Sequence, residues 1–126
     1  MALKTINLET CSLMLDEDGI VELHIHSGVE LAPEKITEIF ENIHSDMPEA
    51  TTLLVTAGDR ATLSPEARDL VSSGSVTQQI KADAIVTEHY SHQMSANFFV
   101  RYNKPQRPTK LFKTAEEAKE WLKTFS

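Results

Sequence analysis

The sequence predicts an α/β fold, a right-handed β-α superhelix around a mainly parallel sheet of four or five strands, with an N-terminal β-hairpin and about four helices. Three observations support this prediction. Segments of helical and strand periodicity alternate along the chain. The short apolar runs at 52–57 and 82–87 lack polar alternation, which is typical of central parallel strands covered on both faces. The chain closes with a capped amphipathic helix. Its 126 residues are expected to form a single domain, 1–126.

The first third predicts a hairpin followed by a helix. Apolar residues alternate with other residues through 11–15 and again through 21–26, and Asp16-Glu17-Asp18-Gly19 between them supplies a turn. Pro33 stands at the expected first position of a helix. After it, apolar side chains recur at helical spacing: Ile36, Ile39, Phe40, Ile43 and Met47.

The middle of the chain alternates strands and helices. Ser64-Pro65 begins a second helix after the 52–57 strand, and Gly74 is its expected end. The 82–87 strand leads to a third helix, expected over 91–102. Such alternation implies right-handed crossover connections between parallel strands.

The last third of the sequence gives the clearest prediction of secondary structure. Pro105 and Pro108 end the third helix and lead into a short strand at 109–112. Thr114 and Glu117 form a capping box at the start of the closing helix. Its apolar stripe consists of Ala118, Trp121, Leu122 and Phe125.

The charge and composition of the sequence argue against several partners and locations. A net charge of −7 repels nucleic-acid backbones, so nucleic acid is not an expected partner. No apolar run approaches the about 18 residues that span a bilayer, and no secretory signal is visible, so we expect a cytoplasmic protein without an integral membrane segment. Cys11 is the only cysteine, which excludes an internal disulfide.

Several C-terminal motifs carry a family resemblance. They are Asn97-Phe98-Phe99, Asn103-Lys104-Pro105, Arg107-Pro108-Thr109, Leu111-Phe112, Glu116-Glu117-Ala118 and Trp121-Leu122. With the order of elements, they resemble the SpoIIAA-like group of STAS/SEC14-type bacterial domains. The resemblance implies a shape related to anti-sigma-factor antagonists and CRAL-TRIO lipid carriers, and it implies no established catalytic activity.

One departure from that family concerns phosphorylation. Regulatory STAS antagonists carry a phosphorylatable Ser beside an Asp and a Gly after the strand equivalent to 52–57. Here Asp59 and Ser64 are present, but the compact arrangement is not. We expect the Ser64 hydroxyl to cap the helix that follows rather than to be a phosphosite.

Ligands of open α/β sheets bind beyond the carboxyl ends of the strands. The polar residues there are His26, Asp59, Arg60, Thr87, Glu88 and His89, with His92 one turn further along. His89 and His92 would offer two metal ligands, but exposed loop histidines are the commoner reading. Glu22, His24 and His26 share one strand face, and for them a solvated or helix-covered face is preferred. No metal and no cofactor are expected.

A cationic run is the second candidate feature. Its members are Arg101, Lys104, Arg107, Lys110 and Lys113. They would attract an anionic headgroup, a phosphorylated metabolite or an acidic partner surface, such as Glu34, Glu38 and Glu41 of a second copy. The alternative is a solvated edge whose cations prevent strand aggregation.

Aromatic and Met side chains on the expected third helix give the third feature. Met94, Phe98, Phe99 and Tyr102 would line a ligand cavity or simply form core. Phe98 and Phe99 are adjacent, so a helix cannot bury both side chains on one narrow apolar stripe. One of them is expected to contact another layer or a partner subunit, which favours self-association.

The sequence therefore favours a non-catalytic regulatory or binding module that acts through protein contacts or as a homodimer. The alternative is a carrier of a small hydrophobic or anionic amphipathic ligand, with Met94 and Phe98 as its wall and Arg101, Lys104 and Arg107 as its rim. A third hypothesis is an enzyme or metal protein using His26, Asp59, His89 and His92. No common catalytic motif supports it, and four glycines leave little for a nucleotide cradle.

Overall fold

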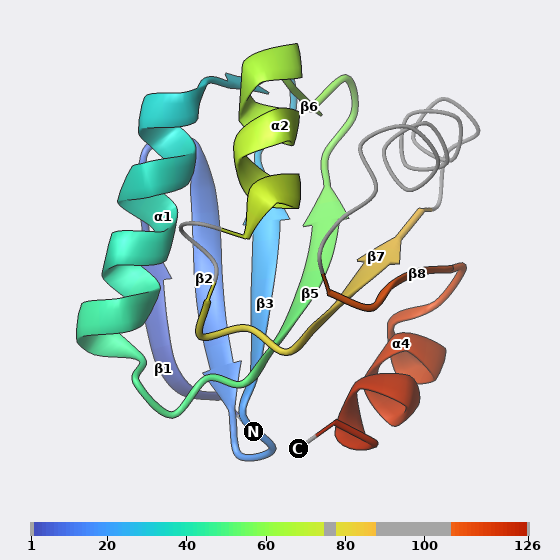
Figure 1. Ribbon diagram of the computed structural model, residues 1–126. Helices are drawn as coiled ribbons and strands as arrows, with labels where there is room; N and C mark the ends of the chain where they lie inside the picture. The colour runs from blue at the N-terminus through green and yellow to red at the C-terminus, as the bar shows by residue number, and fades with distance from the viewer. Residues whose placement is uncertain (1, 75–77, 88–106, 126) are drawn as a thin grey trace.

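The computed structural model describes residues 2–74, 78–87 and 107–125, and these form a mixed six-stranded sheet with helices on both faces (Figure 1). The strand order is β1-β2-β3-β5-β7-β8. The strands are β1 (Ala2–Asn7), β2 (Cys11–Asp16), β3 (Ile20–Ile25), β5 (Thr52–Ala57), β7 (Ala82–Val86) and β8 (Thr109–Phe112).

The sheet divides into an antiparallel and a parallel half. β2 pairs antiparallel with β1 and β3, whereas β3, β5, β7 and β8 pair parallel to one another. The turn from β2 to β3 is closed by Asp16, whose carboxylate accepts hydrogen bonds from the Asp18 and Ile20 amides, while Gly19 adopts a φ of +80°. The alternating pattern at 11–25 thus corresponds to a β2–β3 hairpin at the sheet's antiparallel side.

The sheet has six strands, one more than the upper limit of the predicted four or five. The missing strand is β1, an edge strand in which Ile6 packs against the core while Leu3 remains exposed. An edge strand buries little, so its sequence carries little apolar alternation. A second sheet was also not predicted, because its strands β4 (Glu30–Leu31) and β6 (Thr62–Leu63) have two residues each.

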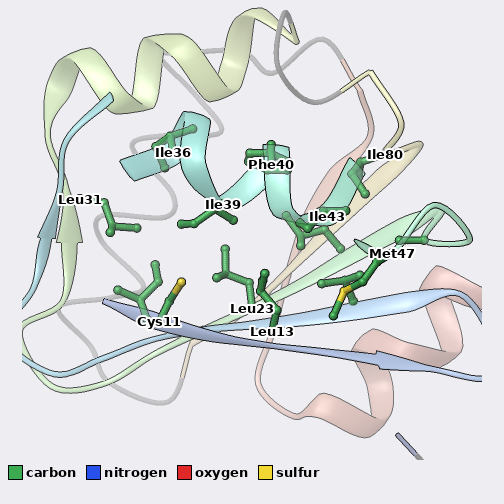
Figure 2. Packing of buried hydrophobic residues seen from close by; sticks show 14 of the residues in the cluster. Cys11, Leu13, Leu23, Leu31, Ile36, Ile39, Phe40, Ile43, Met47 and Ile80 are labelled. Atoms are coloured by element: carbon green, nitrogen blue, oxygen red, sulfur yellow. The ribbon is translucent and has the colours of Figure 1, made fainter. Parts of the chain in front are cut away.

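Three helices lie within the described part of the chain. In Figures 1 and 2, α1 (Pro33–Asp46) and α2 (Pro65–Ser73) lie on one face of the sheet and α4 (Ala115–Lys123) on the other. All three begin where the sequence predicts. The expected helix at 91–102 lies outside the described residues.

The main core lies between α1 and the antiparallel half of the sheet (Figure 2). Ile36, Ile39, Phe40 and Ile43 of α1 are buried, as their spacing predicts. They face the inward side chains of β2 and β3, which include Cys11, Leu13 and Leu23. Met47, at the end of α1, is also fully buried.

A second, smaller core lies under α4. Ala118 and Leu122 are fully buried against Leu54, Ala82 and Ala84 of the central strands. Trp121 and Phe125 are half-buried beside them, and their ring centroids lie 4.8 Å apart at 71°. The Glu117 amide donates to the Thr114 hydroxyl, which confirms the predicted cap. The 52–57 and 82–86 strands are therefore covered on both faces, as their continuous apolar runs predict.

Candidate functional site: an apolar cavity beside a buried ion pair

A cavity of about 150 Å³ lies between α1, α2 and the parallel strands. Its floor includes Leu23, Val55 and Ile85, which are neighbours in register across β3, β5 and β7. Ile36 of α1 and Val71 of α2 contribute from the helices. The complete described lining is Leu23, Ile25, Leu31, Ile36, Phe40, Leu53, Val55, Thr56, Ala57, Ala61, Thr62, Leu63, Arg68, Val71, Asp83, Ile85, Val86 and Thr87.

Thirteen of these eighteen residues are apolar. Three of the five polar ones are threonines, so the charge of the described lining comes from Arg68 and Asp83 alone. The space lies toward the carboxyl ends of β3, β5 and β7, the edge at which parallel α/β sheets bind ligands. Such a lining suits the body of a small apolar molecule.

Asp83 belongs to a buried ion pair. Its Oδ2 lies 2.6 Å from Nη2 of Arg107, and their side chains are 4% and 8% exposed. The Arg107 guanidinium also donates, through Nη1, to the carbonyl of Val71 at 3.2 Å. Arg107 therefore ties the segment before β8 to β7 and to α2, and both of its partners line the cavity.

The ion pair does not bring the pKa of the Asp83 carboxyl below its ordinary value. Burial raises the pKa of the Asp83 carboxyl above its ordinary value of 3.8, and the nearby Arg107 charge offsets this only in part. Removing either partner would leave a charge or a strong donor in a dry environment.

The position of Arg107 differs from the prediction. The cationic run was expected to form a solvent-facing rim, but the Arg107 side chain is buried against Asp83. Lys110 is in register with Ala84 and lies on the face of the sheet that α4 covers. Its ammonium is 5.5 Å from the centroid of the Phe112 ring. Arg101 and Lys104 lie outside the described residues, as do His89, His92, Met94 and Phe98.

The other candidates occupy the connection between β5 and α2. Asp59 and Arg60 are exposed and lie 3.9 Å apart, and Arg60 has a φ of 63°. Neither lines the cavity. The Ser64 hydroxyl accepts a hydrogen bond from the Ala67 amide at 3.1 Å, so the predicted cap is confirmed. His26 follows β3 in the neighbouring segment, where Gly58 donates to the Ile25 carbonyl, and its Nδ1 is hydrogen bonded to the Glu9 carbonyl.

The described ranges 2–74, 78–87 and 107–125 offer little for other kinds of site. There, no three His, Cys, Asp or Glu side chains come together as metal ligands. The helices of these ranges are all too short or too polar to span a bilayer. Cys11 is buried in the main core, and burial raises the pKa of its thiol, which makes it a poor nucleophile.

Comparison with known proteins places the chain in a family. A family model described as a domain of unknown function, DUF7793, matches residues 13–126. The chain belongs to the DUF7793 family. No curated protein matches it. A crystal structure of an uncharacterised protein of the DUF3478 family from Shewanella loihica PV-4, described as having a SpoIIAA-like fold, matches the DUF7793 domain with a TM-score of 0.63.

That structural match covers 94% of this chain and 98% of the Shewanella protein at 15% sequence identity. At such low identity the match shows a shared fold and nothing more. The resemblance to SpoIIAA-like domains is thereby confirmed at that level.

Sequence reasoning expected ligands at the carboxyl ends of the strands, where it named Thr87, which lines the cavity, but it found neither the rest of the cavity nor Asp83. The cavity is assembled from β3, β5, β7, α1 and α2, which are far apart along the chain, so no local motif marks it. One signal for Asp83 was present. An acid inside the apolar run 82–87 lies in a strand that is covered on both faces, and such an acid requires a buried cationic partner.

Proposed function

We propose that the DUF7793 domain is a non-catalytic binding module that takes a small, largely apolar ligand in the cavity between α1, α2 and the sheet. The supporting observation is the cavity itself, with a volume of about 150 Å³ and thirteen apolar residues in its described lining. Engineered apolar cavities near ~150 Å³ bind benzene. The threonines and the two charged residues would orient a polar end of the ligand.

The energetic cost of such a space supports a binding role. Protein interiors are close-packed and rarely contain voids larger than a water molecule. The apolar side chains that line this partly open space lack packing partners on one side, so they lose dispersion contacts. A ligand that fills the cavity would recover part of that cost, so the bound state is expected to be the more stable one.

A simple aromatic probe tests the proposal. Toluene should bind saturably and raise the melting temperature of the wild-type domain, measured by circular dichroism. Val55→Phe should abolish this rise, because Val55 lies in the cavity floor between Leu23 and Ile85. Met14→Phe is the control, since Met14 is exposed and does not line the cavity.

Two results would count against a ligand cavity. One is a wild-type melting temperature that does not respond to toluene up to its solubility limit. The other is an equal rise in the Val55→Phe and wild-type proteins, which would place the probe elsewhere.

Self-association is the second candidate function. One observation favours it: Leu3 on the edge strand β1 is 60% exposed, and Met14 on the neighbouring β2 is 39% exposed. An edge strand with an exposed large apolar side chain can pair with the same strand of a second copy. Sedimentation velocity should then show a dimer that Leu3→Glu converts to monomer. A wild-type monomer at high micromolar concentration would reject this role.

A further inference from the structure

Two histidines lie side by side on the face of the sheet opposite the cavity. His24 in β3 and His26 just after it are two positions apart, so their side chains share one face of the strand. Glu22 of β3 is on the same face and pairs with Lys119 of α4 at 3.3 Å. Leu23 lines the cavity from the other face. The histidine pair is therefore separate from the cavity, and its ring centroids are 6.3 Å apart.

Hydrogen bonds hold the Nδ1 atom of each ring. Nδ1 of His26 lies 3.2 Å from the Glu9 carbonyl, which can only accept, so Nδ1 carries the hydrogen and Nε2 the lone pair of the neutral ring. Nδ1 of His24 lies 2.8 Å from the Thr56 hydroxyl, and donation to that oxygen gives the same tautomer. Within the described residues, neither Nε2 atom has a hydrogen-bond partner. Histidines that bind metals are held in this way, through the second ring nitrogen.

We propose that His24 and His26 bind a divalent late transition-metal ion through their Nε2 atoms, with Cu²⁺ preferred over Ni²⁺ and Zn²⁺. The sequence analysis expected no metal, and this site goes beyond the proposed ligand cavity. Neutral imidazole suits all three ions, and Cu²⁺ has the highest affinity in the series.

The spacing of the two rings allows them to share one ion. An imidazole nitrogen binds Zn²⁺ at ~2.0–2.1 Å, so two rings on one ion have centroids within about 6.4 Å of each other. The observed 6.3 Å lies at the edge of this reach, and rotation of the exposed His24 ring would bring both Nε2 atoms closer. Water would complete the coordination, because no cluster of three His, Cys, Asp or Glu occurs in the described ranges.

Metal titration of the untagged protein tests the site. Isothermal titration calorimetry should show Cu²⁺ binding, weaker binding of Ni²⁺ and Zn²⁺, and none of Mg²⁺, which prefers oxygen ligands. His24→Gln and His26→Gln should each weaken Cu²⁺ binding about tenfold or more, because each removes one of the two ligands. His44→Gln is the matched control, since His44 is an exposed histidine on α1 and should leave the affinity unchanged.

Electron spin-echo envelope modulation of the Cu²⁺ complex counts the bound imidazoles. It should report two in the wild-type protein and one in each single variant. Fewer than two in the wild type, or an unchanged Cu²⁺ affinity in both variants, would overturn the proposal. Loss of affinity in His89→Gln/His92→Gln instead would also overturn it, by placing the ion on the other histidine pair of the sequence. The response to toluene should be the same in His24→Gln and wild type, so failure of the metal site would leave the proposed function standing.

Discussion

Arg107→Met should destabilise the domain by about 3–5 kcal/mol, the largest effect that we expect from a single substitution. It leaves the Asp83 carboxyl without its cationic partner in a position where its side chain is 4% exposed. It also removes the hydrogen bond that Arg107 donates to the Val71 carbonyl. Urea denaturation followed by circular dichroism would measure the loss at neutral pH.

The double variant Asp83→Val/Arg107→Met is the control for this substitution. Replacing both members of a buried ion pair by apolar residues is often neutral or stabilising. We therefore expect the double variant to be clearly more stable than Arg107→Met alone. A double variant as unstable as the single one would show that Arg107 contributes packing rather than charge compensation.

The deficit of Arg107→Met should depend on pH in a known direction. Burial raises the pKa of Asp83, and Arg107→Met removes the Arg107 charge, which is the largest of the interactions that offset that rise. In the unfolded chain the carboxyl titrates near its ordinary value of 3.8. Between the two values the folded variant binds more protons, so its stability increases as the pH falls through the folded pKa. The deficit relative to wild type should therefore be largest at neutral pH and shrink in acid.

Leu122→Ala should cost about 2–5 kcal/mol, because it opens a cavity in the core under α4. Leu122 is fully buried there with Ala118, against Leu54 and Ala84. Urea unfolding can be followed by the fluorescence of Trp121, the only tryptophan, which lies next to the deleted side chain.

Glu120→Ala on the same helix is the matched control. The Glu120 side chain is 79% exposed, and its ion pair with Lys123 at 3.8 Å is a surface pair of small value. It should stay within about 0.5 kcal/mol of wild type. If Leu122→Ala lost no more stability than Glu120→Ala, α4 would not be packed on the sheet as described.

Much of the fold was predictable because its signals are local. Ser64 and Thr114 mark helix starts through their hydroxyls, and both caps are present. The spacing of the apolar residues on α1 fixed its buried face. β1 was missed because an edge strand buries too little to impose alternation on its sequence.

The candidate site was less predictable because it depends on pairs that are distant in sequence. Asp83 and Arg107 are 24 positions apart, and only the pairing of β7 with β8 brings them together. In the sequence, Arg107 looks like one member of a regular cationic series. The fold instead turns it inward, while Lys110 lies on the opposite side of the sheet.

The central claim, that the cavity between α1, α2 and the sheet holds an apolar ligand, can be tested at atomic resolution. Isotope-filtered NOE spectroscopy on labelled protein with unlabelled toluene reports which methyl groups touch the probe. We predict NOEs from toluene to the methyl groups of Leu23, Val55 and Ile85, which share the cavity floor. NOEs confined to the exposed Leu3 and Met14, or no NOEs at saturating toluene, would contradict the claim.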